Sequence, residues 1–475
     1  MTETLLRANA GPRMDRLPLS PWHYRLVALI ASGMFIDAFE IYSGGAVLAS
    51  MLSTGWSTLT LNATFVSVTM FGLVCGAWLA GVLGDRFGRR FCYQANLALF
   101  GVSSVLAAFA PNMEVLIGLR FLMGIGLGAE IVVGYGTLTE FLPKASRGRV
   151  MTLVGTLVNT SFFLSYAIAY FVIPVWGWRA MFLLPGLAAL GIWLARKSLP
   201  ESPRWLESKG RTAEAAALLD RIEAEIAASG RVIPSFVPAE VNTTPVSVRV
   251  LFSPGVLRNT MIGMLVNVTV NFTLYGFLQW LPSVFVRDGM ALGTALQIAM
   301  VLGLGKSVGG LLGMALADRL GRKGCTVIFS VAAAALGMVM IYTHGAAFLV
   351  TVFLLSVCLG LTNSIAFSLY VPELFETRFR LRGSGLCNSV GRLSSAGLQY
   401  AIPPIVALAG LSGLTFALSG VLLLQAVVVG VFGIETRRKA LDNPEVSAHT
   451  PDAASPGANA PGTDAPAITR MARQG

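Results

Sequence analysis

The chain has 475 residues, of which 55% are hydrophobic and only 12% are charged, and its formal net charge is +11. This composition predicts many apolar runs of about 20 residues, the length with which a helix crosses roughly 30 Å of hydrocarbon. The positive charge could indicate a nucleic-acid partner, but Lys and Arg gather in every second loop between the apolar runs, which excludes that interpretation.

We predict an all-α membrane protein with about twelve transmembrane helices. The first span has no small-residue cleavage site behind it, so we interpret it as retained and not as a signal peptide. The predicted spans lie near 25–48, 61–83, 91–110, 113–137, 149–173, 179–198, 256–281, 292–317, 324–343, 347–371, 384–409 and 411–434.

The basic loops predict the orientation of the chain. The intervening loops hold only Arg179 and Arg287. By the positive-inside rule, both termini and the long middle loop are expected in the cytoplasm. The basic loops hold Arg86, Arg89, Arg90, Lys144, Arg147, Arg149, Arg319, Arg322, Lys323, Arg378, Arg380 and Arg382.

The first span contains two acids, Asp37 and Glu40, within "GMFIDAFEIYS" (33–43). They stand three residues apart and therefore share a helix face. Two close carboxylates in a low-dielectric site do not both ionise easily, so we predict that one or both bind a coupling proton, with Asp37 favoured because it is deeper. The alternative is that they pair with Arg120 or another basic group and set the tilt between helices.

An internal repeat joins the two sets of spans. "GVLGDRFGRR" (81–90) recurs as "MALADRLGRK" (314–323), and "EFLPKASRGR" (140–149) recurs weakly as "ELFETRFRLR" (373–382). Both pairs are 233 residues apart, as from Asp85 to Asp318. Equal spacing predicts two parallel six-helix halves with a substrate site between them near mid-bilayer.

The fourth span carries Glu130, which the same offset matches with Asn363. A carboxylate in one half and an amide in the other suit an asymmetric central site, so we predict that Glu130 binds protons or substrate. The alternative is an ion pair between Glu130 and Arg120 or Lys306.

The seventh span provides a polar face, because Asn267, Asn271 and Tyr275 recur every four residues. Together with Gln279 this face could orient a small ring, or it could form an ordinary hydrogen-bonding face between helices. Asn159 in the fifth span and Asn388 in the eleventh are weaker candidates for substrate binding.

Two basic residues lie inside spans of the second half. Lys306, near the middle of the eighth span, cannot snorkel easily to either surface. Arg392, in the eleventh span, has a guanidinium suited to bidentate carboxylate binding. Both favour an anionic substrate, although both could instead belong to structural ion pairs.

The remaining segments divide the chain. We expect a tail (1–22), a bundle (23–198), a middle loop (199–255) with the amphipathic helix "TAEAAALLDRIEAEIAA", a second bundle (256–435) and a tail (436–475). Both tails are rich in small and polar residues without periodicity and are predicted to be disordered. The cysteines show no paired CxxC spacing, so neither a disulfide framework nor a zinc site is expected, nor any cofactor.

The repeated loop resembles the signature loop of the major facilitator superfamily. The second copy has Met314 where the first has Gly81. Physically, Asp85 and the following basic cluster can pair with the neighbouring helix as a latch that breaks when the halves rock; alternatively the arginines only set topology. The predicted gating residues are Gly81, Asp85, Arg86, Gly88, Arg89, Arg90, Arg120, Glu140, Arg149, Asp318, Arg319, Gly321, Arg322, Glu373 and Arg382.

Three further motifs resemble branches of this superfamily. "LPESPRWLESKGR" (199–211) is similar to sugar porters and metabolite/proton symporters. "FIDAFEIY" resembles the first-span motif of metabolite and aromatic-acid/proton symporters, and "GAEIVVGYGTLTEF" (128–141) resembles the fourth span of nicotinate-type transporters. "RFLMGIGLGAE" (120–130) is similar to the fourth-span motif of the superfamily as a whole.

These observations predict a monomeric secondary transporter of the inner membrane that imports a small, carboxylated organic acid with protons by alternating access. A sugar or polyol carrier is the main alternative, opposed by the missing paired glutamines of the seventh span. A drug/proton antiporter is less favoured, because the fifth span lacks a GPxxGG-like kink. A receptor that does not transport remains open. An enzyme and an ATP-driven pump are disfavoured, because HExxH, GxSxG and GxxxxGK[ST] motifs are missing from the sequence.

Overall fold

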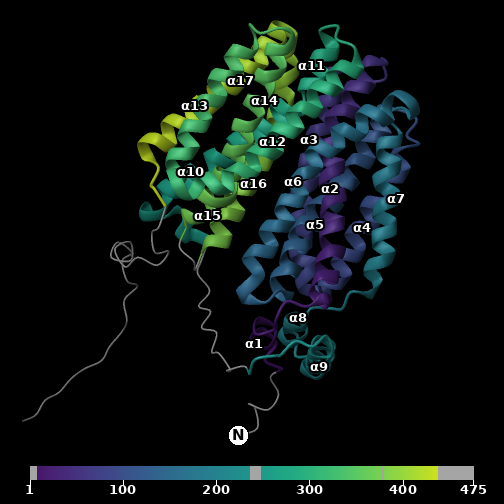
Figure 1. The fold of residues 1–475 in the computed structure, drawn as a ribbon. Coiled ribbons are helices and arrows are strands. Elements are labelled where there is room, and N and C mark those ends of the chain that lie inside the picture. Colours follow the sequence, from purple (N-terminus) through teal and green to yellow (C-terminus); the bar gives the residue numbers. More distant parts are fainter. Residues whose placement is uncertain (1–7, 236–247, 376–378, 437–475) are drawn as a thin grey trace, which may run out of the picture.

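The computed structural model describes residues 8–235, 248–375 and 379–436, apart from the side chains of residues 248, 314, 315, 317–319 and 381. The helices form two bundles that lie side by side (Figure 1). The first bundle consists of α2 (Pro21–Ser53), α3 (Leu59–Phe87), α4 (Arg89–Ala107), α5 (Met113–Phe141), α6 (Lys144–Trp176) and α7 (Ala180–Ala195), which continues into the 3-10 turn η2 (Arg196–Ser198).

The second bundle contains two helices that change to π geometry within the span. These π segments are η4 (Phe272–Leu278) and η5 (Asn363–Tyr370). The bundle consists of α10 (Pro254–Asn271), η4, α11 (Leu281–Arg287), α12 (Leu292–Leu320), α13 (Arg322–Met340), α14 (Gly345–Thr362), η5, α15 (Val371–Glu373), α16 (Arg380–Leu398), η6 (Gln399–Ala401) and α17 (Ile402–Phe432), preceded by the 3-10 turn η3 (Val248–Phe252).

Each of the twelve predicted spans corresponds to a helical stretch. By length and composition, 10 described stretches could cross a membrane, and the one from Arg382 to Phe432 contains two predicted spans. These two separate at Gly410, whose φ of 54° is not helical. The third predicted span is α4, which is helical but is not among the 10. The all-α fold expected from the sequence is therefore confirmed.

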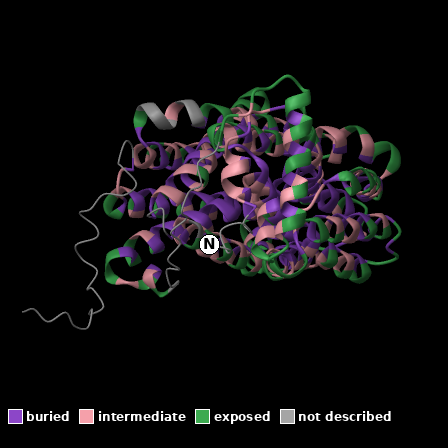
Figure 2. Ribbon diagram, turned by 90° about the horizontal axis from the view of Figure 1, so that it is seen from below, coloured by how far each residue is buried: buried purple, intermediate pink, exposed green. Residues whose placement is uncertain are grey.

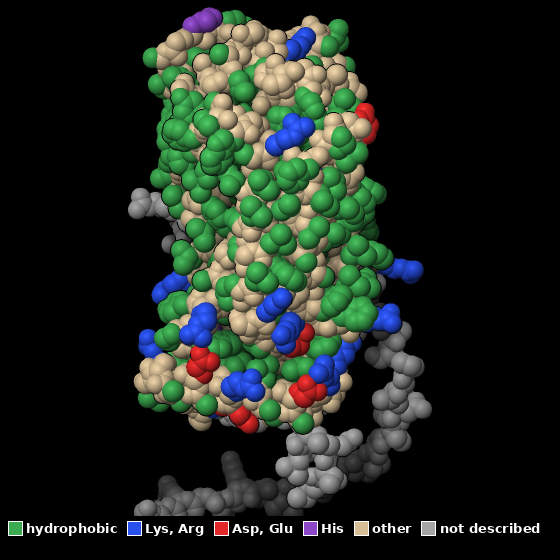
Figure 3. All heavy atoms as spheres, turned by 90° about the vertical axis from the view of Figure 1, so that its right-hand side faces the viewer, with side chains coloured by type: hydrophobic (Ala, Val, Ile, Leu, Met, Phe, Trp, Pro, Cys, Tyr) green, Lys and Arg blue, Asp and Glu red, His purple; other side chains and the backbone are tan. Residues whose placement is uncertain are grey.

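The surface matches a protein that spans a membrane. A broad band of hydrophobic side chains covers the middle of the face in Figure 3, and most Lys, Arg, Asp and Glu side chains gather below it. We call this lower end, which carries α8 (Pro203–Ser208) and α9 (Thr212–Ala228), the basic end. The other end is called the opposite end.

Glycine lets the helices of the first bundle pack closely. A Cβ atom on Gly128 of α5 would lie 2.1 Å from the carbonyl oxygen of Leu73 in α3. This distance is far below van der Waals contact, so only glycine permits the approach. The glycine-rich fourth-span motif thus has a packing role.

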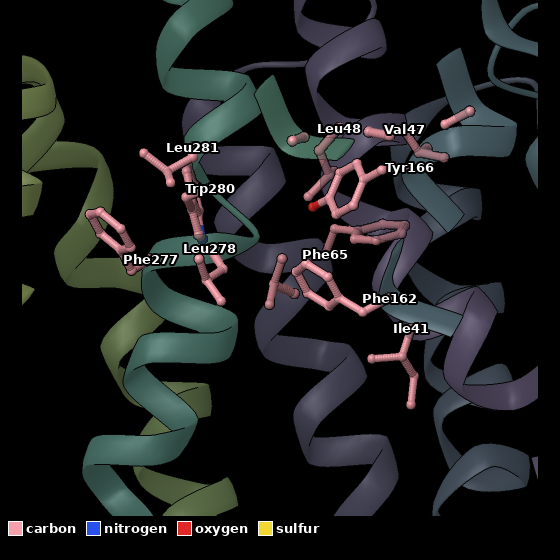
Figure 4. Close-up of a cluster of buried hydrophobic side chains, with 14 of the residues drawn as sticks. Ile41, Val47, Leu48, Phe65, Phe162, Tyr166, Phe277, Leu278, Trp280 and Leu281 are labelled. Atoms are coloured by element: carbon pink, nitrogen blue, oxygen red, sulfur yellow. The ribbon is translucent and has the colours of Figure 1, made fainter. Parts of the chain in front are cut away.

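The two bundles meet near the opposite end. Side chains of both bundles share one apolar cluster there, with Leu48 and Tyr166 facing Trp280 and Leu281 (Figure 4). The bundles also approach backbone to backbone, because a Cβ atom on Gly45 of α2 would lie 2.6 Å from the carbonyl oxygen of Gln279. This end of the interface is closed.

Three helices, α1 (Ala10–Asp15), α8 and α9, lie below the first bundle (Figure 1), and we call them the annex. The stretch predicted as an amphipathic helix is α9, whose Leu219, Ile222 and Ile226 are buried. Figure 2 views the molecule from this side and shows exposed residues along the outer helices and buried ones between them.

The annex corrects one expectation about the N-terminal tail. Residues 10–15 were expected to be disordered, but they form α1 (Ala10–Asp15), which packs on α8 and α9. Arg13 pairs with Asp220 at 2.6 Å and with Glu223 at 2.9 Å. Periodicity could not reveal α1, because a six-residue helix offers only one apolar pair four residues apart, Ala10 and Met14. The predicted disordered tail from residue 437 onward lies outside the described residues.

Candidate functional site

The first buried ion pair joins α2 to α5. Nη1 of Arg120 donates to Oε1 of Glu40 at 2.7 Å, and Nε donates to the hydroxyl of Thr69 in α3 at 3.0 Å. The guanidinium also lies over the ring of Phe65, with its central carbon 4.8 Å from the ring centroid. Both charged side chains are 1% exposed, so the charge of Glu40 is paired inside the first bundle.

A second buried ion pair joins α5 to the end of α7. Nη1 of Arg196 lies 2.6 Å from Oε1 of Glu130, and both side chains are 1% exposed. The sequence interpretation had named Arg120 and Lys306 as possible partners of Glu130, but the partner is Arg196. Glu130 therefore lies inside the first bundle and does not face Asn363 across the interface.

Asp37 lies next to this second pair and, among the described residues, has no partner of its own. Its residue is 2% exposed, and neither carboxylate oxygen has a hydrogen-bond partner in the described part of the chain. Glu130, Arg196 and Glu40 all lie within electrostatic range of Asp37.

The charges of the first bundle do not balance. The buried core between α2, α5 and α7 holds three carboxylates, Asp37, Glu40 and Glu130, against the guanidiniums of Arg120 and Arg196. A buried charge without a partner is expensive, so one bound proton is the simplest way to neutralise the cluster.

The second bundle contributes a buried cation, Lys306 of α12. Its Nζ lies 4.5 Å from the ring centroid of Tyr42 and 4.3 Å from that of Phe162, both in the first bundle. The residue is 5% exposed, and Nζ has no hydrogen-bond partner among the described residues. Cation–π contacts attract an ammonium group but leave its hydrogen-bond donors available.

Lys306 lies on the wall of a cavity of about 310 Å³ between the two bundles. The predicted substrate residues Asn159, Lys306 and Asn363 all line this cavity. Other lining residues that the sequence interpretation missed are Tyr135, Thr152, Thr156, Ser307, Ser364 and Ser368. The walls of the cavity run along α6 toward Met151, in the basic-end part of that helix, so its polar space lies on the basic side of the closed interface.

A neighbouring cavity holds two more of the predicted residues. Asn267 and Asn388 line it together with Tyr135 and Ser368, which line the first cavity as well. Nε of Arg392 donates to Oδ1 of Asn388 at 2.8 Å. Arg392 also lies within electrostatic range of Tyr42 and Tyr275. Arg392 is thus near the Lys306 region without lining either cavity.

The polar face of the seventh span is only partly directed at the cavities. Nδ2 of Asn267 donates to the carbonyl oxygen of Gly263, and Nδ2 of Asn271 donates to that of Asn267, both one turn earlier in the same helix. Gln279 is 5% exposed and lies against Gly44 of α2, at the closed end of the interface. Neither Asn271, Tyr275 nor Gln279 lines the two cavities.

The predicted latch residues of the first copy form ion pairs at the basic end. Nη2 of Arg89 lies 2.8 Å from Oε1 of Glu140, and Nη1 lies 3.4 Å from Oδ1 of Asp85. Glu201 accepts the backbone N–H of Arg89 at 2.8 Å, beside Gly88, whose φ of 96° favours glycine. Arg86, Arg149 and Gly81 are exposed, and Arg90 donates to the carbonyl oxygen of Lys197.

The second copy repeats this arrangement. Nε of Arg322 lies 3.2 Å from Oε2 of Glu373, and Glu435 accepts the backbone N–H of Arg322 at 2.9 Å. Gly321 has a φ of 85°, the counterpart of Gly88. Arg382 is exposed, and the side chains of Asp318 and Arg319 lie outside the described residues. In each copy the ion pair joins two helices of the same bundle. A second glutamate, Glu201 or Glu435, accepts hydrogen bonds from the backbone at the start of α4 or α13.

The sequence interpretation missed several of these residues. Arg196 stands at the end of a predicted span, where an arginine is expected merely to mark a membrane boundary. Tyr42 and Phe162 were indistinguishable from packing aromatics. Glu201 lies in the quoted "LPESPR" motif and could have been identified as a helix-capping acid, whereas Glu435 has no such motif.

The chain is similar to known transport proteins over most of its length. A family model described as "Sugar (and other) transporter" matches residues 28–446. The inner membrane metabolite transport protein YdjE of Escherichia coli (strain K12) is 36% identical over 441 residues, covering 91% of this chain and 97% of that protein.

Two further similarities concern a transporter with a named substrate and a solved structure. The niacin transporter NiaP of Acinetobacter baylyi is 30% identical over 437 residues, covering 91% of this chain and 98% of that protein. The inward-open structure of the xylose transporter XylE from E. coli aligns with a TM-score of 0.69 and 18% identity, covering 90% of this chain and 99% of that one. At this identity the structural likeness concerns the fold alone.

Proposed function

Because this chain belongs to the sugar (and other) transporter family of the major facilitator superfamily, and is therefore a transporter and not an enzyme, we propose that it imports a small carboxylic acid together with protons. The observation that carries this proposal is a pair of uncompensated buried charges. Lys306 lines the cavity, and its buried ammonium group has no hydrogen-bond partner among the described residues; Asp37 is a buried carboxylate that also has none among them. The first calls for an anionic substrate and the second for a proton.

The surroundings of Lys306 favour an aromatic acid. Tyr42 and Phe162 place two rings beside the ammonium group of Lys306. Tyr135 lines the cavity that Lys306 also lines. A volume of about 310 Å³ is at the lower end of the range for small-molecule sites, roughly 300–1,000 Å³. Niacin, named for a relative, is a one-ring acid of this kind.

Alternating access supplies the transport step. The interface is closed at the opposite end, and the polar cavity lies on the basic side. With the basic end in the cytoplasm, as the positive-inside rule predicts, this conformation faces inward. We place the protein in the inner membrane, as the name of one relative indicates for that protein, with both termini cytoplasmic.

A sugar carrier is the second candidate, supported by the family name and by the "PESPR" motif. A neutral sugar would leave the ammonium group of Lys306 without a counter-ion, which disfavours this candidate. Arg392 nearby adds to the positive charge of the region.

Thermal stabilisation of the purified protein separates these candidates, since a ligand that binds the folded state raises its apparent stability. The probes are matched pairs: nicotinate against nicotinamide and benzoate against benzamide, which share a ring and differ in the carboxylate, with xylose as the sugar. We expect the acids to raise the melting temperature and the amides to leave it unchanged. Stabilisation by xylose with no response to either acid would contradict the proposal.

A further inference from the structure

The structure assigns a role to Arg196, and this inference rests on the proposed proton-coupled function. We propose that Arg196 is a positioning residue for the coupled proton: it holds Glu130 as an ionised partner, so that Asp37 is the carboxylate that takes up and releases the proton.

Arg196 is fixed by contacts at three nitrogens. Nη1 lies 2.6 Å from Oε1 of Glu130, Nε donates to the carbonyl oxygen of Leu29 at 2.8 Å, and Nη2 donates to that of Ile30 at 2.8 Å. A planar guanidinium with its nitrogens engaged in this way cannot turn toward another carboxylate without losing contacts. The arginine is therefore held on Glu130.

The helix α2 is shaped to receive this guanidinium. A Cβ atom on Gly33 would lie 2.0 Å from Nη2 of Arg196 and 3.0 Å from Oε1 of Glu130. Asp37 follows Gly33 by four residues and so lies on the same face of α2, one turn further along. The ion pair and the unpaired acid are thus neighbours on one helix face.

Within the described part of the chain, the ionisable groups around the cluster come from four elements. Tyr93 of α4 lies within electrostatic range of both Arg196 and Glu130, and Glu40 is engaged by Arg120. The groups facing the cluster are Asp37 and Glu40 from α2, Tyr93 from α4, Arg120 and Glu130 from α5, and Arg196 from η2.

The net charge of the three side chains determines how many protons the site binds. Asp37, Glu130 and Arg196 together carry one net negative charge when all are ionised, so one proton on Asp37 neutralises them. The proton arrives from water on one side of the membrane, forms an O–H bond on the Asp37 carboxylate and leaves to water on the other side. Without Arg196 the same site carries two negative charges, and the last proton is released only at higher pH.

The test is an infrared pH titration of the purified full-length protein, following the C=O band of protonated carboxylic acids. This readout needs no substrate. We expect wild type to lose one such band with a single midpoint and Asp37→Asn to lack that band. In Arg196→Gln we expect the midpoint to move to higher pH by about one to three units, the effect of removing a nearby opposite charge.

Three variants serve as controls. The double variant Arg196→Gln, Glu130→Gln restores one net negative charge at the site. Its titration midpoint is therefore expected to return toward that of wild type. A merely structural role of Arg196 would not produce this return. Arg179→Gln removes an arginine that donates to the carbonyl oxygen of Ala110 near the other end of α7 and is expected to titrate like wild type. If Arg196→Gln does not fold, Gly33→Ala displaces the guanidinium without removing an ionisable group and is expected to shift the midpoint in the same direction.

The possible results distinguish the role of Arg196 from the proposed proton coupling. A wild-type midpoint in Arg196→Gln or Gly33→Ala, with the band missing from Asp37→Asn, would overturn the role of Arg196 and leave proton coupling intact. A band that persists in Asp37→Asn would overturn Asp37 as the proton carrier, and the proposed function with it if uphill uptake also persists.

Discussion

At the scale of single residues, the surroundings of Lys306 carry the proposal of an anionic ligand. Its ammonium group is buried and contacts the rings of Tyr42 and Phe162, which attract the charge without accepting its hydrogen bonds. A carboxylate would supply the missing acceptors. An ordinary structural lysine would already have them.

Replacing this lysine tests that interpretation directly. For Lys306→Ala we expect the affinity for the carboxylated ligand to fall by about 10- to 100-fold, the loss of a hydrogen bond between charged groups of about 1.5–3 kcal/mol. Ligand titration by tryptophan fluorescence or calorimetry measures it. The exposed Lys209→Ala serves as a control with unchanged affinity. Equal affinity in both variants would make Lys306 structural.

Asp37 leads to a different kind of prediction, about coupling. Asp37→Asn keeps the shape of the side chain but cannot lose a proton, so we expect uphill, proton-driven uptake into proteoliposomes to disappear while exchange of substrate across the membrane continues in part. Asp288→Asn, at the opposite end, should retain both activities. Undiminished accumulation by Asp37→Asn would rule out the assignment.

At the scale of elements, one of the two π segments lies at the cavity between the bundles. η5 contains Asn363, Ser364 and Ser368, which line the cavity, whereas η4 contains Tyr275, which does not. Single π turns inside α-helices occur frequently at functional sites. The sequence predicted the seventh and tenth spans correctly but could not predict their π geometry, because no residue pattern distinguishes it from an α-helix.

The attachment of α1 to α9 includes an ionic contact whose strength depends on pH. Partial burial alone would raise the pKa of Glu223, but hydrogen bonds from Arg13 and Arg16 outweigh it and hold that pKa below its ordinary value. The carboxylate therefore stabilises the docked α1 at neutral pH, and this contribution is lost as the pH falls through the lowered pKa.

Hydrogen exchange of residues 10–15 measures this contribution. We expect Glu223→Gln to exchange about tenfold faster than wild type at pH 7, and the difference to vanish at a pH below the lowered pKa of Glu223, where the wild-type carboxyl is also neutral. Glu214→Gln, on the exposed side of α9, is the matched control and should leave the exchange unchanged. Equal exchange of wild type and Glu223→Gln at pH 7 would mean that apolar packing alone holds α1.

At the scale of the whole molecule, the distribution of charge predicts the orientation. Ser229→Cys at the basic end should react with a membrane-impermeant maleimide in inside-out vesicles, and Thr54→Cys at the opposite end in right-side-out vesicles. Both positions are exposed. The native chain provides the labelling background, since it contains cysteines of its own. The reverse pattern would invert the proposed topology.

The parts of the molecule that were predictable are those determined by local composition. Apolar runs of bilayer length predicted the spans, and the repeated loop motif predicted equivalent loops in the two halves, where the structure places the ion pairs Arg89–Glu140 and Arg322–Glu373. Pairing between distant helices was not predictable in the same way. Glu130 and Arg196 are far apart in the sequence, and nothing local shows that they meet.

The close contact of Gly44 and Gly45 with Gln279 has a mechanical consequence. At Gly45 the two bundles approach backbone to backbone, and residue 45 itself has no side chain that could rotate aside to admit a water molecule or a small solute. Rotation of a side chain at residue 45 therefore cannot open this contact, and we expect it to open when the two bundles move apart. With glycine at this position, we expect the passage between the bundles to be either closed or open, without a partly open state.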